Sequence, residues 1–541
     1  MTRKHGILMT AFLLATAWCS GQTAGKDTVL NGSVIEVIQT YKPQVRAASR
    51  PEWVPQLPAT DTTHPVFKYA VPQQPLFYSY HSDPLKPLAL GKDTVPLPLP
   101  NYVMAGVGNL TTLFLDAGIG GYSAPGYETF LHVHHLSQKG SVKYEQSALT
   151  GLEAEGLLHR EHGDWHSTLG LERNQYYYYG YNHALYDYNN TDSLKQTFFD
   201  LSATADYKRK EEGESLIDMH PKIDADYYGA RFKTHELDLG FDVPMSVEIK
   251  DDLEGKLNVF GHFAGLTADT LSKSNILFGL APGAELKREH YSGHAYLGLA
   301  FGQGGTAHLL PDVVGCVEIP NSPIKVSAGW SASEYRNTYK ELTTENPYLF
   351  GNYKPVQTRK DELFVKADGQ LGQLNFAGRA GWDNFKGLPG FLDTVGDRKQ
   401  FMPVYDTVSA LFFELAAKYL MADRYVVGLS AVYRNYYQGT SQHPWELPGL
   451  TLRADGAISP MAGLTVSAYL SVMQGIYALD TKNKVSELQP ITDFGCNGEY
   501  RLNLQFSAFL QVSNMLNSHY QRWMGYDSYG INIYGGVRMK F

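Results

Sequence analysis

Short runs in which hydrophobic and polar residues alternate recur about every twenty residues from residue 101 to residue 541. One run spans residues 425–434, and its hydrophobic face carries Tyr425, Val427, Leu429, Ala431 and Tyr433. Its opposite face carries Gly428, Ser430 and Arg434. Because successive side chains of a β-strand point to opposite faces, each run predicts a strand with one apolar and one polar face.

The length of these runs favours strands that cross a membrane. The apolar face stays continuous across residues 464–472, 502–512 and 529–541. A strand of a soluble sandwich usually has about 5–6 residues, whereas a strand that crosses a bilayer needs about 9–11. The pattern therefore predicts an all-β protein, a transmembrane antiparallel β-barrel whose polar face lines a lumen. The competing interpretation is a secreted soluble β-protein such as a propeller.

Tyrosines at the ends of the apolar faces favour the barrel over the propeller. Tyr425 and Tyr433 share one face, and their separation corresponds to about 20 Å along the membrane normal for a tilted strand. Tyr529 begins the apolar face of the last run. We expect these three tyrosines to belong to the aromatic girdles that border the lipid-facing band of such barrels.

The connections between the late runs alternate in length. Short connections lie near residues 422–423, 460–462 and 501, and long ones near residues 385–404, 435–447, 477–487 and 515–528. Outer-membrane barrels have short periplasmic turns and long outer loops, so this alternation places the C-terminus on the periplasmic side. Counting every run gives about 22 strands, with about 18 or 20 as alternatives because the N-terminal half is less regular.

The first hundred residues differ from the rest. Residues 1–21 have the basic start, short apolar run and small final residues of a signal peptide. Cys19 also permits a lipoprotein interpretation, which the bulky Trp18 before it disfavours. Residues 22–100 predict an extended proline-rich segment, because proline cannot donate to a β-ladder. Within this segment a candidate partner-docking strand is formed by Val34, Ile35, Val37 and Ile38.

The composition of the chain bears on what the protein can bind and where it can lie. The net charge of −9 gives no electrostatic basis for binding nucleic acid. The chain has 37 tyrosines, the residue type best suited to a boundary between apolar and aqueous surroundings. Cys316 and Cys496 remain after the signal peptide, and we interpret both as small packing residues rather than a disulfide framework.

The C-terminal stretch resembles the end of a TonB-dependent receptor barrel. Such barrels end with a V-x-N-hydrophobic strand, a tyrosine-containing loop, a Gly-Tyr pair and a last strand that finishes in phenylalanine. The matching positions here are Val512, Asn514, Leu516, Tyr520, Gly525, Tyr526, Gly530 and Phe541. The resemblance covers about 35 residues. It implies a location in the outer membrane of a Gram-negative bacterium, contact with membrane lipid, and Phe541 as the signal read by the barrel-assembly machinery.

The N-terminal segment departs from that family. TonB-dependent receptors carry a long globular plug before the barrel, and no such domain fits into residues 22–100. The stretches NYVMAGVGNLTT and HHLSQKGSV resemble TonB-dependent receptor-like barrels of Bacteroidetes that lack a plug. We therefore expect a barrel without a plug domain. A periplasmic or TonB-like partner is expected to contact residues 22–100, through residues 27–30 or 34–38, by pairing of strand edges.

Motifs for catalysis or for cofactors are missing from the sequence. No catalytic triad, P-loop, zinc motif or calcium loop has the required spacing, so we predict no enzyme, no cofactor and no metal site. His132, His134 and His135 lie close together without a local carboxylate or cysteine, which favours a structural role. For the tyrosine tract at residues 176–181, packing in a girdle or loop is favoured over stacking against sugars.

Charged residues on the polar faces are the remaining candidates for function. The residues expected to face the lumen are Glu414, Lys418, Arg434, Arg453, Asp455, Arg538 and Lys540. A lumen of about 22 strands is wide, and charges of both signs could cross-link it or contact residues 22–100. Two functions follow: transport of a solute or polymer across the outer membrane, or a non-conducting scaffold of an envelope or secretion complex.

Overall fold

The computed structural model describes residues 101–541 apart from residues 125, 211–216, 232, 270, 422–424, 438, 440–442 and 481. These residues belong to one compact unit, Pro96–Phe541. The expected signal peptide, the proline-rich segment and the run from Val34 to Ile38 all lie outside the described residues, and they stay predictions. No helix among the described residues is both long and apolar enough to cross a membrane.

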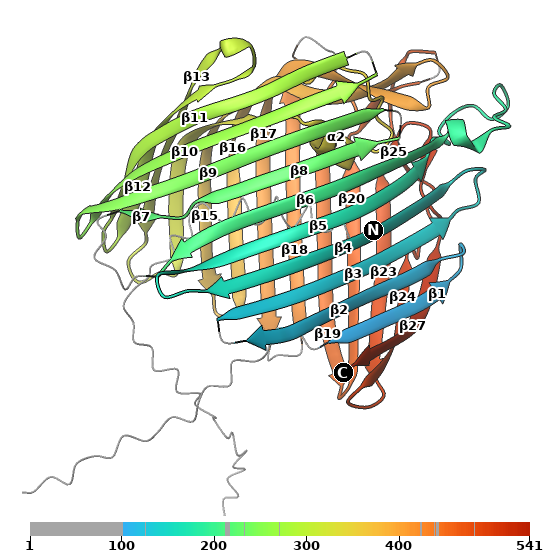
Figure 1. The fold of residues 1–541 in the computed structure, drawn as a ribbon, viewed down its shortest axis with the longest axis horizontal. Helices are drawn as coiled ribbons and strands as arrows, with labels where there is room; N and C mark the ends of the chain where they lie inside the picture. The colour runs from blue at the N-terminus through green and yellow to red at the C-terminus, as the bar shows by residue number, and fades with distance from the viewer. Residues whose placement is uncertain are drawn as a thin grey trace, which may run out of the picture. The chain divides into compact units, whose positions relative to one another are not determined.

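Long strands account for most of the described chain (Figure 1). The strands of the main ring are β1 (Tyr102–Gly108), β2 (Leu113–Ala124), β3 (Tyr127–Lys139), β4 (Gln146–His159), β5 (Gly163–Tyr177), β6 (Lys195–Arg209), β8 (Lys222–Ala230), β9 (Thr234–Lys250), β10 (Leu253–Ala268), β11 (Leu271–Lys287), β12 (Tyr291–Phe301), β13 (Ala307–Glu318), β14 (Ile324–Tyr335), β15 (Thr358–Leu371), β16 (Leu374–Val395), β17 (Gln400–Met421), β18 (Tyr425–Tyr437), β19 (Leu450–Met461), β20 (Leu464–Gln474), β23 (Ile491–Arg501), β24 (Phe506–Ser513) and β27 (Asn532–Lys540).

Short elements lie in the connections. They are the 3-10 helices η1 (Thr191–Ser193) and η2 (Gln303–Gly305), the helix α2 (Tyr339–Glu345), and the strands β7 (Asp218–Met219), β21 (Tyr477–Leu479), β22 (Val485–Glu487), β25 (Gln521–Trp523) and β26 (Tyr526–Asp527).

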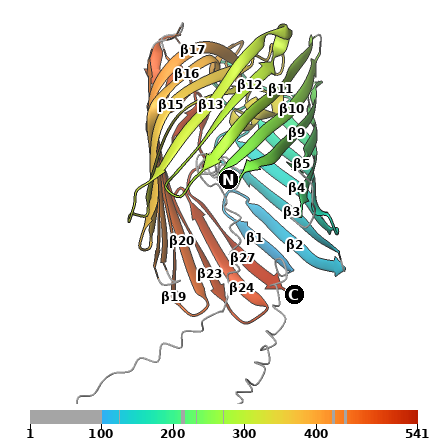
Figure 2. The same cartoon turned by 90° about the vertical axis from the view of Figure 1, so that its left-hand side faces the viewer.

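The main strands form one closed ring. Each strand pairs antiparallel with the next, and the last strand, β27, returns to pair with β1 over Val103↔Met539 and the residues around it (Figure 2). Counted over the described residues, the ring has 22 strands, which confirms the prediction of a transmembrane antiparallel β-barrel of that size. Closure leaves no unpaired edge, a condition that a bilayer imposes on every sheet that crosses it.

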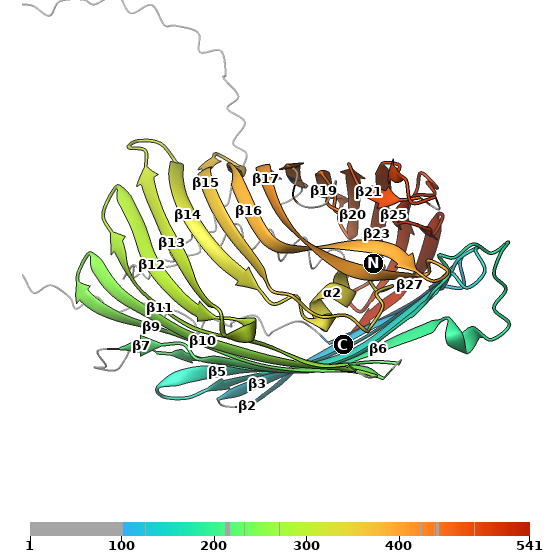
Figure 3. The ribbon, with the colours of Figure 1, turned by 90° about the horizontal axis from the view of Figure 1, so that it is seen from above.

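The two faces of the ring differ in the way that the alternation predicts. On β9, Leu237 and Leu239 are more than two-fifths exposed, while Glu236 and Asp238, which alternate with them, are buried. Figure 3 shows α2 inside the ring of strands, and Glu236 accepts a hydrogen bond from the backbone N–H of Tyr339 in α2. Glu236 and Asp238 therefore lie on the inner face, and the exposed leucines form part of an outer apolar belt.

The two ends of the barrel also differ. Most of the long connections, including residues 178–194, 336–357, 475–490 and 514–531, lie at one end, while the long connection between β6 and β8 lies at the other. The opposite end carries short turns and the start of β1, where the backbone N–H of Phe541 donates to the carbonyl oxygen of Asn101 over 2.9 Å. Long connections follow β18, β20 and β24 as expected, but the one expected near residues 385–404 is mostly strand, because β16 extends to Val395 and β17 begins at Gln400. Residue 541 lies at the end that carries most of the short turns.

The seam between β27 and β1 has no room for a side chain at Gly536. A Cβ atom there would overlap the carbonyl oxygen of Ala105 and lie 2.6 Å from Cα of Gly106. Gly536→Val is therefore expected to prevent ring closure and to lower the yield of folded barrel severalfold. The measurement is the heat-modifiable band on electrophoresis of membranes that express the variant.

Gly498 on β23 provides the matched control for this prediction. An added Cβ at Gly498 meets no atom within 4 Å. Gly498→Val should leave the folded fraction unchanged. Equal yields from the two variants would contradict the importance of close packing at the seam.

Candidate functional site

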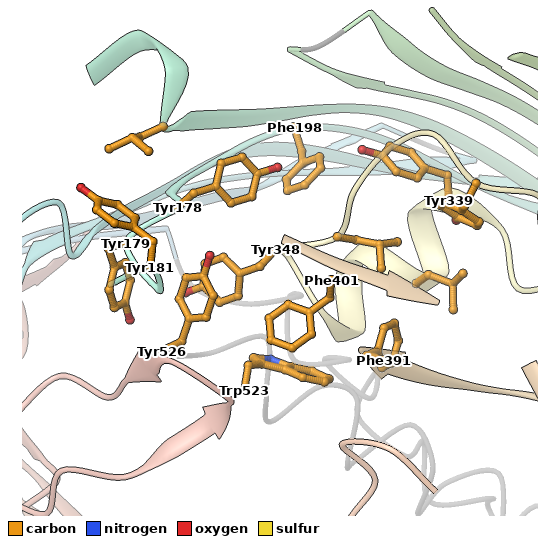
Figure 4. Packing of buried hydrophobic residues seen from close by; sticks show 14 of the residues in the cluster. Tyr178, Tyr179, Tyr181, Phe198, Tyr339, Tyr348, Phe391, Phe401, Trp523 and Tyr526 are labelled. Carbon is orange, nitrogen blue, oxygen red and sulfur yellow. The ribbon is translucent and has the colours of Figure 1, made fainter. Parts of the chain in front are cut away.

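A cluster of buried aromatic side chains, which we call the mouth cap, packs at the end of the barrel that carries most of the long loops (Figure 4). Its members come from the loop after β5, the inner wall, the α2 segment, the end of the β16–β17 hairpin and the β24–β27 connection. They are Tyr178, Tyr179, Tyr181, Leu194, Phe198, Tyr228, Leu266, Tyr339, Leu342, Tyr348, Leu349, Tyr353, Phe391, Phe401, Trp523 and Tyr526. Residues that are far apart in sequence thus share one apolar core.

Ring contacts hold the loops of the mouth cap together. Tyr348 and Tyr526 stack with centroids 3.5 Å apart and planes inclined by 16°. Trp523 meets the rings of Phe391 at 5.2 Å and of Phe401 at 5.8 Å, both edge to face. Such aromatic pairs each contribute about 0.5–1.5 kcal/mol beyond the area they bury. The contacts are non-covalent and join separate loops, so the cap can come apart along them.

The helix α2 fixes one side of the cap to the inner wall. Thr338 and Glu341 form a capping box at its start, which satisfies backbone N–H groups of the first turn. Glu236 of β9 accepts hydrogen bonds from the backbone N–H of Tyr339 over 2.8 Å and of Lys340 over 3.2 Å. The ammonium of Lys340 lies 2.6 Å from Asp226 of β8 and 3.0 Å from Asp200 of β6. The helix is therefore held by three neighbouring wall strands.

A second set of polar contacts, made by Arg522 of the β24–β27 connection, joins three loops. The guanidinium donates to the carbonyl oxygen of Glu446 over 2.7 Å and lies 3.9 Å from the carboxylate of Glu345 at the end of α2. It also lies over the ring of the neighbouring Trp523, with 4.0 Å to the centroid. We call Arg522, Glu446 and Glu345 the loop latch.

The carboxyl group of Glu446 is almost completely buried. The residue is 1% exposed, and one carboxylate oxygen accepts a hydrogen bond from the backbone N–H of Met524 over 3.3 Å. Burial raises the pKa of Glu446 to about 8. Removal of a charged carboxylate from water is unfavourable, so the buried side chain retains its proton near neutral pH. The latch therefore contains a group that titrates in the physiological range.

Below the cap, the wall formed by β15 to β18 carries a balanced ladder of charges. Its members are Lys360, Glu362, Arg379, Asp383, Glu414 and Arg434. Arg379 of β16 contacts Glu362 of β15 on one side and lies 3.7 Å from Glu414 of β17 on the other. Arg434 donates to Glu414 over 2.8 Å. With three cations and three anions, the ladder gives this part of the lumen a polar surface without a large net field.

The structure brings together two of the seven residues expected to face the lumen, Glu414 and Arg434. The other five are distributed over the wall. The guanidinium of Arg538 lies 3.3 Å from Glu499 and over the ring of Tyr102. Lys418 of β17 and Asp455 of β19 both pair in register with Gly428 of β18, one from each side.

Arg453 and Lys540 complete the set. Arg453 pairs in register with Ser430 of β18. Lys540 pairs with Tyr102 at the end of the barrel that carries the short turns. These residues line different heights of the wall and do not form one site.

The three tyrosines expected in the aromatic girdle occupy two kinds of position. Tyr425 and Tyr433 lie on β18 and are each 43% exposed on the same face as the outer apolar belt. Tyr529 lies in the β24–β27 connection, and its hydroxyl donates to Ser147 of β4 over 3.0 Å. This contact holds Tyr529 among the loops, which differs from the expected girdle position. Phe541 is 58% exposed at the end of the chain.

The histidines near the start of the barrel take up polar contacts within the wall. His132 bonds to Asp116 of β2 over 3.1 Å, and the rings of His132 and His134 have centroids 5.4 Å apart. Asp116 also accepts a hydrogen bond from the hydroxyl of Tyr102 over 2.6 Å. Among the residues that the structure describes, no group of three or more histidine, cysteine or acidic side chains could hold a metal ion.

Little in the pattern of residues indicates the latch or the α2 anchor. Glu236, Glu446 and Arg522 each lie in a stretch without a recognised motif, and their partners are distant in sequence. The signal that was available is the Thr338–Glu341 capping box, which marks a helix start inside a long connection. For the tyrosine tract at residues 176–181, the structure places Tyr178, Tyr179 and Tyr181 in the mouth cap, so the favoured role in loop packing describes them correctly.

No protein-family model and no curated protein matches the chain. Among solved structures, the barrel is similar to the FrpB iron transporter of Neisseria meningitidis, with a TM-score of 0.64, 11% identity, and coverage of 82% of this chain and 81% of that one. The ferric enterobactin receptor PfeA of Pseudomonas aeruginosa gives a TM-score of 0.59 at 9% identity, covering 82% and 80%. The copper transporter OprC gives 0.60 at 12% identity, covering 82% and 81%.

At these identities the likeness establishes a shared fold. The chain has the 22-stranded barrel of TonB-dependent receptors, as its C-terminal motif predicts. The three similar structures are named as transporters and a receptor, not as enzymes. The fold is that of Gram-negative outer-membrane barrels, and the exposed apolar belt provides the surface that such a membrane requires.

The buried carboxyl of Glu446 makes the mouth cap sensitive to pH. Its pKa in the folded protein, about 8, exceeds that of an unfolded glutamate, so its stabilising contribution is complete below about pH 4 and is lost as the pH rises through about 8. We expect proteolysis within residues 514–531 of the detergent-solubilised barrel to accelerate between about pH 6 and about pH 9.

Glu446→Gln separates this effect from the pH dependence of the protease. The variant keeps the shape and a hydrogen-bonding side chain but cannot ionise. The ratio of wild-type to variant cleavage rates should rise severalfold between the two pH values. A ratio that does not change with pH would show that Glu446 does not control the cap.

Proposed function

We propose that this barrel transports a solute or polymer across the outer membrane and that the mouth cap is its gate. The observation that carries the proposal is the construction of the mouth cap: at one end of a wide ring with a charge-lined inner wall, long loops meet through separable ring contacts and hydrogen bonds. A ring of this strand number encloses more space than its own inward side chains fill. The fold shared with FrpB, PfeA and OprC supports the same assignment.

The position of the charges supports a gate rather than a permanent seal. Arg522 contacts the loop of Glu446 and the end of α2, while α2 is itself fixed to the wall through Lys340 and Asp226. Movement of the β24–β27 connection would break the latch and separate Tyr526 from Tyr348. The wall contacts of α2 would stay intact, so the opening motion would concentrate in the latch loops.

The N-terminal segment is assigned a role at the periplasmic end. Residues 22–100 would act as an extended arm, with Val34, Ile35, Val37 and Ile38 adding a strand to the edge of a periplasmic or TonB-like partner. Phe541, exposed at the end of the chain, would be the residue recognised by the barrel-assembly machinery. The inward charges Lys418, Arg453, Asp455 and Lys540 would line the transport path.

The alternative function is a non-conducting scaffold of an envelope or secretion complex. The closed mouth cap is compatible with it, because a barrel that never opens would need such a cap. The two functions differ in one measurable property, which is whether ions pass through the barrel.

Electrical recording in planar bilayers tests transport directly. We expect the mature full-length protein to give discrete ohmic openings on the nanosiemens scale, and deletion of residues 22–100 to increase their size or frequency. Folding of the deletion variant is checked by its heat-modifiable band. If neither protein gave an ionic current and periplasmic partners co-purified, transport would be overturned and the scaffold supported.

Arg522→Ala tests the mouth cap as the gate. Loss of a charged hydrogen bond between loops weakens the closed state by about 2 kcal/mol, which corresponds to a rise of about thirtyfold in the ratio of open to closed time. Single-channel recording measures this ratio.

Lys484→Ala is the control, because Lys484 is exposed in the connection between β20 and β23 and bonds to Asp480 through its backbone N–H and carbonyl groups. An equal effect of the two substitutions would exclude the latch as the element that holds the gate shut.

A further inference from the structure

A groove with a basic lining opens on the outer face of the barrel beside the mouth. It has a volume of about 510 Å³ and is lined by Arg173, Asp192, Lys195, Thr197, Phe199, Tyr227, Gly229, Ala230 and Arg231. These residues come from β5, β6, β8 and the connections at their loop ends, and the three strands pair side by side (Figure 1). The mouth cap and the lumen wall do not use this groove.

Alternation along the strands puts the groove on the outside. Phe199 and Leu201 of β6 are 39% and 46% exposed, whereas Phe198 and Asp200, which alternate with them, are buried. Phe198 packs in the mouth cap, and Asp200 contacts Lys340 of α2. Arg173 pairs in register with Phe199, and Phe199 pairs with Gly229. The cations of the groove therefore share the face of the apolar belt and not the face of the lumen.

The groove lies where the apolar belt ends. Directly below Arg173 and Phe199, one register step toward the short turns, come Leu171, Leu201 and Tyr227, all strongly exposed. Further exposed side chains, Leu169 and Ile223, continue this apolar wall. A bound molecule with an anionic head and hydrocarbon chains would thus find cations for its head and a leucine surface for its chains.

The protein neutralises only part of the positive charge in the groove. Arg231 pairs with Asp192 over 3.2 Å, and its side chain is 34% exposed. Within the described part of the chain, neither Arg173 nor Lys195 has a carboxylate partner. Three cations against one carboxylate leave an excess of positive charge at a membrane boundary, in a protein whose net charge is −9.

We propose that this groove binds the phosphorylated sugar headgroup of a glycolipid in the outer leaflet, with its acyl chains lying along Leu171 and Leu201. Guanidinium groups bind phosphate through paired, charge-assisted hydrogen bonds. Arg173 lies beside Phe199 on one side of β6, and Arg231 lies beside Thr197 on the other side. The aromatic side chains Phe199 and Tyr227 supply flat surfaces at the level where headgroup and chains meet. A free phosphate ion would use the cations but not the apolar wall below them.

Native mass spectrometry of the full-length protein, released from detergent micelles, tests the proposal with monophosphoryl lipid A as the probe. The triple substitution Arg173→Gln, Lys195→Gln and Arg231→Gln should weaken binding about a hundredfold, at about fivefold for each charge. Replacement of both arginines by lysine keeps the charge but not the paired hydrogen bonds, so it should weaken binding less than the triple substitution. The matched control is Lys386→Gln, because Lys386 is an exposed cation near the loop end of β16 that lies outside the groove.

Three results would overturn the proposal. Equal binding of dephosphorylated lipid A by the wild-type protein would exclude recognition of phosphate. Displacement of lipid A by an equal concentration of inorganic phosphate would identify a site for free anions instead of a lipid site. A triple variant that binds lipid A as well as Lys386→Gln would show that the groove is not involved. The heat-modifiable band confirms that every variant is folded, so a weak signal cannot arise from an unfolded barrel.

Discussion

The pairing of β27 with β1 is the interaction on which the rest of the structure depends. In hydrocarbon, each unpaired backbone N–H or C=O is strongly unfavourable, so a sheet that crosses a membrane has to close on itself. Closure between Val103 and Met539 brings the two ends of the described chain together. It also divides every strand into an apolar outer face and a polar inner face, and both candidate sites follow from that division. The glycines at the seam, including Gly536, are required because the strands approach too closely for side chains.

Closure of a ring with this many strands also leaves a wide aqueous lumen, and the long connections pack together at one end of it. Most of the turns at the other end are too short to reach across the lumen. The long connections contribute aromatic rings that pack with one another, as Tyr348 does with Tyr526. Apolar packing alone has little directionality, and the latch of Arg522 and Glu446 adds specific contacts between the loops. A cap built in this way is stable but does not need to unfold the barrel in order to open.

The parts that sequence could predict are those set by local periodicity. The faces of β18, the lengths of most of the late connections and the size of the barrel all follow from a two-residue repeat, and the C-terminal motif predicted the fold family. The mouth cap could not be predicted, because Tyr179, Phe401 and Trp523 meet only after the ring has closed. Tyr529 shows the limit most clearly: it continues the alternation of the last run, yet β27 starts later, at Asn532, and the tyrosine belongs to a loop. Local periodicity does not mark the residue at which a strand begins.

Strand β6 connects the mouth cap and the basic groove, because its side chains point alternately inward and outward. Its inward residues Phe198 and Asp200 contact the mouth cap and α2, while its outward residues Lys195 and Phe199 line the basic groove. A headgroup held between Arg173 and Arg231 would link β5 to the end of β8 from outside. The helix α2 links β6, β8 and β9 from inside through Lys340 and Glu236. The two sets of contacts fix the same part of the wall from opposite faces, so the side of the cap that carries α2 is the rigid side. Opening would then fall to the opposite side, where Arg522 and Glu446 join the β24–β27 and β18–β19 connections. These connections bond to the wall through Tyr529 and Trp445, but they carry no helix anchored in the way that α2 is.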